Sequence, residues 1–124
     1  MVIDFHSHIF PGMDDGSSCV EESIAMLEMA AAQGIRTVIA TPHFYAQYDN
    51  PADFLTKRAQ AENCLRQAME GITELPQVLV GAEVYYFPGI SESEVLQKLT
   101  IDGKRGILVE MPRAPWTREM YREL

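Results

Sequence analysis

The chain has 124 residues, 47% of them hydrophobic, and it carries 18 Asp and Glu against 10 Lys and Arg, for a formal charge of −8. One packed domain is expected, because the apolar share is too high for a disordered chain. The acidic balance argues against nucleic-acid binding, and apolar runs shorter than the ~18–20 residues of a membrane span argue against insertion into a bilayer. Cys19 and Cys64 are too few for a disulfide framework and indicate reduced thiols in the cytoplasm.

Short β-rich runs alternate with helical stretches along the whole chain. The predicted elements, in order, are strand 2–8, helix 18–34, strand 35–41, helix 50–70, strand 78–83, helix 91–99, strand 107–111 and helix 117–124. Polar residues mark the helix starts: Ser18 with Glu21 and Ser91 with Glu94 as capping boxes, Asn50 before Pro51, and Thr117. Strands that alternate with helices indicate parallel pairing with right-handed crossovers, so we expect an α/β fold.

Each predicted strand ends in a residue that can bind a metal ion. These residues are, in chain order, His8, His43, Glu83 and Glu110. In parallel α/β folds the carboxyl ends of the strands meet at one edge, where active groups gather. Because all four predicted strands end in such a residue, the sequence predicts that they share one metal site.

His6 and His8 are two residues apart on the first strand, so their side chains are expected on the same side. Both imidazoles can then face one metal ion from a rigid platform. Asp4 lies on that side too, where it could accept the free ring N–H of a ligand histidine. The alternative interpretation is a pair of ordinary histidines at a strand end.

The loop after the first strand contains Asp14-Asp15-Gly16. Carboxylates suit hard or borderline divalent cations, and the glycine permits a tight loop. The pattern does not separate Asp14 from Asp15 as a ligand. An Asx turn that leads into the following helix is the alternative role for these acids.

Glu83 and Glu110 lie near the ends of apolar strands. A carboxylate in such surroundings is unfavourable unless it is paired or bound to a metal ion. The glutamates are therefore candidate ligands beside His43. The alternative is an ion pair with one of three arginines, Arg36, Arg105 and Arg113.

Histidines and carboxylates together describe a mixed nitrogen and oxygen site, which suits Mn, Fe or Zn better than Ca. Two or three such ions close together generate hydroxide near neutral pH and bind a phosphoryl oxygen. Metal-assisted hydrolysis of a phosphoester is thus the favoured reaction class. Four tyrosines flank the proposed site and either line a substrate cleft or pack on its rim: Tyr45, Tyr48, Tyr85 and Tyr86.

Five segments, taken in order, resemble the polymerase and histidinol phosphatase (PHP) superfamily: DFHSH, the DDG loop followed by EES, GIRTVIATPHF, GAEVYYFP and ILVEMP. Within it the chain is most similar to bacterial manganese-dependent tyrosine-protein phosphatases of capsule and exopolysaccharide operons. The resemblance implies a TIM-like distorted (β/α) barrel, with residues 1–124 as the N-terminal part of that domain. Four βα units form about half of such a barrel, so the first and fourth strands are expected to be open edges through which the chain could form a homo-oligomer.

The resemblance also implies the site residues and the cofactor. Up to three divalent ions, chiefly Mn with Fe or Zn as alternatives, would be held there. A metal-bound hydroxide is expected to attack phosphorus while arginines stabilise the phosphoryl oxygens, and Arg113 is the candidate phosphate contact. Asp15 is the alternative to Asp14 as a ligand. The implied ligands are His6, His8, Asp14, His43, Glu83 and Glu110.

Members of this group dephosphorylate the tyrosine-rich tail of a bacterial tyrosine kinase that controls polysaccharide export. The resemblance therefore implies a phosphotyrosine protein as partner, in the cytoplasm. Two alternatives stay open: a non-catalytic metal-binding or interaction module that pairs through its open edges, and another activity of the superfamily such as hydrolysis of histidinol phosphate. The segment GAEVYYFP and the DDG loop favour the tyrosine-phosphatase branch.

Overall fold

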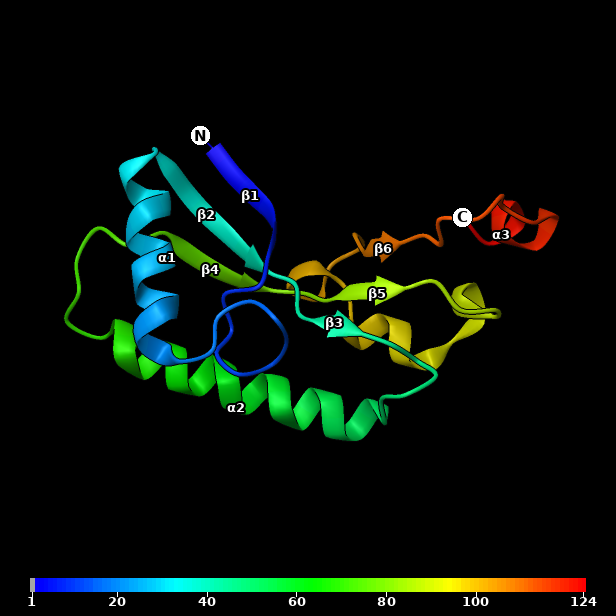
Figure 1. Ribbon diagram of the computed structural model, residues 1–124, viewed down its shortest axis with the longest axis horizontal. Helices are drawn as coiled ribbons and strands as arrows, with labels where there is room; N and C mark the ends of the chain where they lie inside the picture. Colours follow the sequence, from blue (N-terminus) through cyan, green and yellow to red (C-terminus); the bar gives the residue numbers. More distant parts are fainter. Residues whose placement is uncertain (1) are drawn as a thin grey trace.

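The computed structural model describes residues 2–124 and has an α/β architecture (Figure 1). Its strands are β1 (Val2–Ser7), β2 (Ile35–Ala40), β3 (His43–Phe44), β4 (Gln77–Val80), β5 (Glu83–Tyr85) and β6 (Leu108–Glu110). Its α-helices are α1 (Val20–Ala32), α2 (Pro51–Met69) and α3 (Arg118–Glu123). Three short 3-10 helices, η1 (Ile90–Glu92), η2 (Glu94–Lys98) and η3 (Ile101–Gly103), precede the last strand. No helix within residues 2–124 combines the length and the apolar character needed to cross a membrane.

The strands form two parallel three-stranded sheets in the orders β1-β2-β4 and β3-β5-β6. The chain passes from one sheet to the other twice, from β2 to β3 through residues 41–42 and from β4 to β5 through residues 81–82. Backbone hydrogen bonds cross this seam, from Gly81 N to Ala40 O at 2.8 Å and from Glu83 N to Pro42 O at 2.9 Å. The prediction of parallel strands in an α/β fold is therefore confirmed, whereas the unbroken strand 78–83 is wrong.

Helix α2 joins the two halves of the core. It begins where the sequence predicts, because the Asn50 side chain accepts hydrogen bonds from the first turn and Pro51 opens the helix. Phe54 packs with Phe44 in the core beneath β3 and β5, at a ring separation of 5.1 Å. About three turns further along α2, Leu65 packs with α1 and the β1-β2-β4 sheet. The 19-residue length of α2 thus matches the span of both sheets.

The chain bends at Gly81, and Arg58 of α2 holds the bend in place. Its guanidinium donates to the carbonyl oxygens of Gly81, at 2.8 Å, and of Lys98, at 2.9 Å. Burial lowers the pKa of Arg58 from its ordinary value. A strand carbonyl that loses its sheet partner at the break therefore has a charged donor instead.

Two predicted helix caps are wrong. Helix α1 begins after Cys19 without a side-chain cap, and Ser18 bonds to Glu22 instead of closing a box with Glu21. The predicted helix 91–99 consists of the 3-10 turns η1 and η2, because the Ser91 backbone N–H donates to the Glu123 carboxylate at 3.0 Å. A tertiary partner has replaced the local cap in this segment.

Strand β1 lies at one edge of its sheet (Figure 1). It carries exposed apolar side chains. Its register shifts between Asp4 and Ser7, which places His6 in a β-bulge. Val2, Ile3 and Phe5 are exposed, and Phe5 is 59% exposed. Of the six residues of β1, Ser7 alone is buried. Strand β6 is the edge of the other sheet.

Helix α3 begins at the predicted cap Thr117, whose hydroxyl accepts from Met120 N at 3.2 Å. At its other end the Glu123 carboxylate accepts the backbone N–H groups of Gly89, at 2.9 Å, and Ser91, at 3.0 Å. These hydrogen bonds, with the one to Ser91 the largest effect, hold the pKa of Glu123 below its usual range. One carboxylate therefore attaches α3 to the turn that follows β5.

We expect acid to release α3. Because the folded pKa of Glu123 is lowered, its contribution is complete above the usual glutamate pKa and is lost as the pH falls through the folded pKa. Trp116 lies 5.3 Å from Tyr121 of α3, ring to ring, and is the only tryptophan of the chain. Its fluorescence should change over that acid range. In Glu123→Gln the change should already be present at neutral pH, and an unaltered acid transition in this variant would contradict the attachment.

Candidate metal centre

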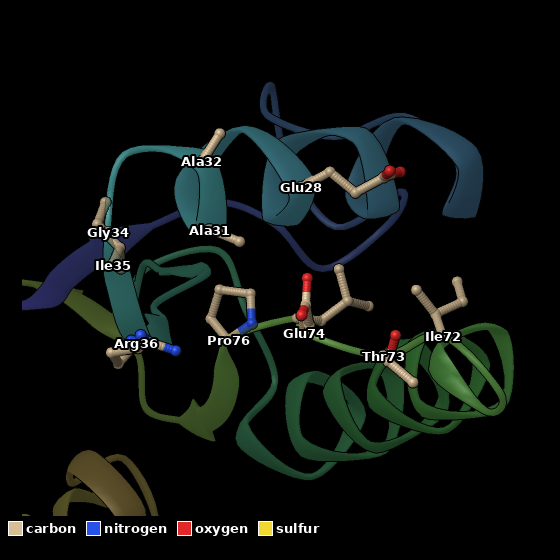
Figure 2. A pocket seen from close by; sticks show the side chains of 11 residues that line it. Glu28, Ala31, Ala32, Gly34, Ile35, Arg36, Ile72, Thr73, Glu74 and Pro76 are labelled. Atoms are coloured by element: carbon tan, nitrogen blue, oxygen red, sulfur yellow. The ribbon is translucent and has the colours of Figure 1, made fainter.

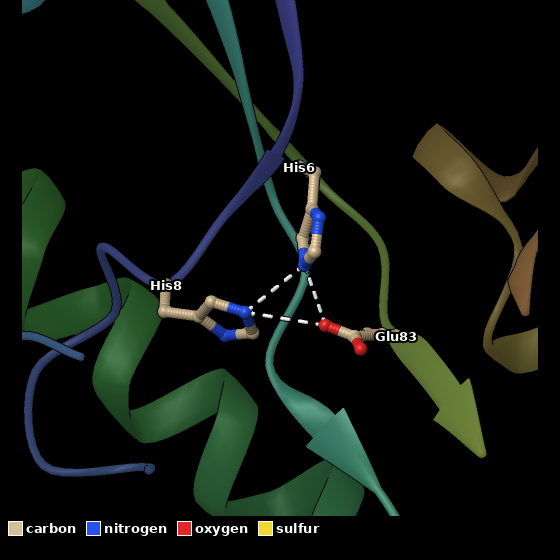
Figure 3. Close-up of side chains that lie close together, drawn as sticks. All are labelled: His6, His8 and Glu83. Carbon is tan, nitrogen blue, oxygen red and sulfur yellow. Dashed lines mark hydrogen bonds and ion pairs between the residues drawn. The ribbon is translucent and has the colours of Figure 1, made fainter. Parts of the chain in front are cut away.

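The predicted site residues gather at the seam between the two sheets. His6 and His8 lie at the end of β1, His43 opens β3 and Glu83 opens β5. His43 and Glu83 are partners in the parallel register of β3 and β5. Because the chain leaves one sheet and enters the other at this seam, the side chains of these residues converge there. Figure 3 shows His6, His8 and Glu83 facing one another.

The Glu83 carboxylate is the centre of the cluster. Its Oε1 atom lies 2.5 Å from His6 Nε2, 3.2 Å from His8 Nε2 and 3.7 Å from His43 Nδ1. The Nε2 atoms of His6 and His8 are 3.1 Å apart (Figure 3). Three imidazoles from two different strands therefore face one carboxylate oxygen.

Asp14 holds the loop of the DDG sequence against the cluster. Its Oδ2 lies 2.9 Å from His8 Nδ1 and accepts the backbone N–H of His43 at 3.3 Å. Its Oδ1 accepts the backbone N–H of Gly16 at 3.0 Å. The Asp15 side chain is 91% exposed, and its Oδ1 is 3.9 Å from His43 Nε2. The structure thus brings Asp14 to the histidines and leaves Asp15 at the surface.

Glu110 ends β6, the neighbour of β5, and its carboxylate comes within 4.8 Å of ligand atoms of His43 and Glu83. Arg113 is exposed beyond β6, without an ion pair or side-chain hydrogen bond to the cluster among residues 2–124. Asp4 does not take the role foreseen for it. Its Oδ1 accepts the backbone N–H of His6 at 3.0 Å, because the β-bulge removes that group from the sheet.

The buried negative charge of the cluster would be stabilised by a bound cation. Glu83 is only 5% exposed, and within residues 2–124 its ion-pair partners are the three histidines, with no lysine or arginine. The suggested pairing with an arginine is therefore wrong for Glu83. A buried carboxylate without a positive partner is strongly unfavourable. Burial and, after it, the charges of Glu110 and Glu83 raise the pKa of the nearby Tyr45.

Two of the spacings between donor atoms suit a metal ion directly. Two ligands about 2.1 Å from one ion lie roughly 3.0–3.4 Å apart. The 3.1 Å and 3.2 Å separations about His8 Nε2 fall in this range. Three overlapping sets place their ligand atoms within 4.8 Å of one another: His6, His8 and Glu83; His8, Asp14 and His43; His43, Glu83 and Glu110. Imidazole and carboxylate together fit Mn, Fe or Zn.

Sequence reasoning passed over the groups that fix the platform. Ser7, between the two histidines, points the other way and donates to Ile39 O at 2.8 Å. Its backbone N–H donates to Thr41 Oγ1 at 3.1 Å, and Thr41 N donates to Ser7 O at 2.8 Å. These buried contacts tie the end of β1 to β2. The available signal was the polar residue between His6 and His8, because alternate residues of a strand point to opposite faces.

A separate hollow of about 490 Å³ lies at the opposite end of the strands (Figure 2). Gly34, Ile35 and Arg36 line it at the start of β2, and Pro76 lines it just before β4. In parallel α/β folds this end contributes to stability, whereas functional groups gather at the carboxyl ends of the strands. The hollow is therefore not part of the candidate metal centre.

A parallel α/β fold with histidines and carboxylates converging at the strand ends defines a candidate metal-centre protein of the α/β class. The chain belongs to the family described as "Capsular polysaccharide synthesis, CpsB/CapC", which matches residues 2–124. The predicted resemblance to a family of bacterial capsule synthesis is thereby confirmed.

Relatives support this assignment. The tyrosine-protein phosphatase YwqE of Bacillus subtilis is 35% identical over 121 residues, which cover 90% of this chain and 43% of YwqE. The tyrosine-protein phosphatase CpsB of Streptococcus agalactiae serotype V is 31% identical over 111 residues, which cover 88% of this chain and 44% of CpsB. The chain thus spans about half the length of the curated relatives it matches.

A solved structure has the same fold over nearly the whole chain. It comes from work on YwqE from Bacillus subtilis and CpsB from Streptococcus pneumoniae, described as unique metal-dependent tyrosine phosphatases. The TM-score is 0.80 at 31% identity, and the match covers 98% of this chain and 49% of that one. The α/β fold with parallel sheets is therefore shared with that protein.

Proposed function

We propose that the chain supplies the metal-binding half of a phosphotyrosine-protein phosphatase that acts in capsule or exopolysaccharide synthesis. Residues 1–124 then form four βα units, the N-terminal part of a PHP-type TIM-like barrel, with β1 and β6 as its open edges. The observation that carries the proposal is the buried Glu83 carboxylate, which faces three imidazoles and has no lysine or arginine partner within residues 2–124. The substrate is a phosphotyrosine protein in the cytoplasm, the tail of a tyrosine kinase.

The roles of the side chains follow from their contacts. His6, His8, His43 and Glu83 hold the metal ions, with Asp14 and Glu110 at the two sides of the cluster. Asp14 also orients the His8 ring through Nδ1, which leaves Nε2 facing Glu83. Divalent ions such as Mn²⁺ supply Lewis acidity and lower the pKa of a bound water. Arg113 contacts the phosphoryl group from the β6 side.

The test is hydrolysis by this chain of a phosphotyrosine peptide and of histidinol phosphate, with and without Mn²⁺. Turnover of the peptide that requires Mn²⁺ supports the proposal, whereas a preference for histidinol phosphate favours the other superfamily activity. Calorimetry with Mn²⁺ accompanies the assay. Metal binding without any turnover would contradict phosphatase activity of this chain and favour a non-catalytic metal-binding module.

One observation favours an interaction role as the second candidate. The edge strand β1 exposes Val2, Ile3 and Phe5, and such an edge can pair with another chain. Sedimentation should then show a homo-oligomer that Phe5→Lys dissociates. A monomer at all concentrations would exclude self-association through β1.

A further inference from the structure

Beside the metal centre lies a hollow of about 220 Å³ whose walls are mainly aromatic. Tyr45, Tyr48 and Tyr85 line it, together with Tyr86 and Phe87. The Tyr45 ring lies 5.7 Å from that of Tyr85 and 6.5 Å from that of Tyr48, centroid to centroid. The Tyr48 side chain is 83% exposed, which leaves this wall open to solvent.

The strands relate this hollow directly to the metal centre. Tyr45 follows His43 by two residues and Tyr85 follows Glu83 by two residues, so each tyrosine continues the face of a candidate ligand. The register of β3 and β5 pairs His43 with Glu83, and the two tyrosines come next along the same direction. The aromatic pair thus follows the candidate ligand pair, with Tyr45 directly after β3 and Tyr85 at the end of β5.

Two contacts make the metal centre and the hollow continuous. The Tyr45 ring stacks on the His43 ring at 5.5 Å with an interplanar angle of 18°. The Tyr45 hydroxyl lies 3.4 Å from His43 Nδ1. A ligand bound at the histidines would therefore lie next to the aromatic walls of the hollow, on the side of Tyr85.

We propose that Tyr45, Tyr48 and Tyr85 form a subsite for the aromatic ring of an aryl phosphoester whose phosphoryl group lies at the metal centre. This inference rests on the proposed function and adds the residues that set its substrate class. In an aryl phosphate the ring is joined to the phosphoryl group through a single oxygen, so the ring occupies the space adjacent to the cluster. Rings in such surroundings gain offset-stacked and edge-to-face contacts, which an alkyl phosphate cannot make.

Calorimetry on the Mn²⁺-loaded chain with phenyl phosphate and ethyl phosphate tests the subsite without requiring turnover. We expect phenyl phosphate to bind about three- to tenfold more tightly. Tyr85→Leu and Tyr48→Leu should each reduce this preference, and the double variant should remove it. The matched control Tyr121→Leu changes an exposed tyrosine of α3 and should keep the full preference.

A second measurement separates this proposal from the proposed function. The fluorine NMR signal of 4-fluorophenol should broaden with the metal-free chain and should sharpen again with the double variant. If the two esters bind equally, the subsite is refuted while the metal centre stands. If neither ester binds but the fluorophenol signal broadens, the aromatic subsite stands and the proposed phosphoester site fails. If fluorophenol is not bound and no preference exists, the aromatic subsite is overturned.

Discussion

Replacing Glu83 with Gln should lower the affinity for Mn²⁺ by about 100-fold or more and remove any metal-dependent hydrolysis of phosphotyrosine. Loss of an outer partner of a metal ligand already lowers affinity by about 10–100-fold. Glu83 has a larger effect because its Oε1 is shared by His6, His8 and His43. The measurement is calorimetry with Mn²⁺, accompanied by the phosphotyrosine assay.

In the metal-free chain the same substitution should leave the stability unchanged or increase it. It removes a buried negative charge that no lysine or arginine neutralises among residues 2–124, so the unfolding temperature should stay equal or rise. The matched control is Glu28→Gln, an exposed glutamate in the hollow at the other end of the strands, which should leave metal affinity unchanged. Lower stability of metal-free Glu83→Gln with unchanged Mn²⁺ affinity would identify Glu83 as a structural residue.

The convergence of the site residues was predictable because it depends on topology. Parallel strands bring their carboxyl ends to one edge whatever the loops do, so His43 and Glu83 were expected at that edge, and the structure places them as direct partners. The contact between Asp14 and His8 depends instead on the path of a loop, which periodicity does not describe. The role of Asp4 was missed for a related reason: the β-bulge at His6 has no signature in the alternation of residues.

Local and long-range determinants can also be distinguished in the fold. Asn50 and Pro51 act within their own helix turn, and local chemistry therefore predicted the start of α2. Ser91 looks equally suitable as a cap, yet its backbone N–H bonds to Glu123, which is 32 residues away. At the break at 81–82, likewise, the Gly81 carbonyl oxygen accepts a hydrogen bond from Arg58 of another element. Local chemistry was not sufficient everywhere, because Ser18 bonds to Glu22 within its own turn and forms no capping box with Glu21. Ser91, by contrast, was overridden by a partner distant in sequence.

Replacing Gly16 should affect both the packing of the DDG loop and metal binding at the candidate metal centre. An added Cβ would overlap with the Cβ and the carbonyl oxygen of His8. That carbonyl accepts the backbone N–H of Ser17 at 2.9 Å, and Gly16 N donates to Asp14 at 3.0 Å. The glycine is therefore required by close approach to β1, and the loop cannot shift without moving Asp14 away from His8.

We expect Gly16→Ala to lower the free energy of unfolding by about 1–3 kcal/mol, the usual effect of overpacking. It should also weaken Mn²⁺ binding by about tenfold, because His8 would lose the partner that orients its ring. Gly106→Ala is the matched control, since a Cβ there meets only an ordinary contact with Ile101. Chemical denaturation and calorimetry measure the two effects. If Gly16→Ala destabilises the chain but binds Mn²⁺ as tightly as the parent, the DDG loop supports the fold alone, and Asp14 does not set the geometry of the metal centre.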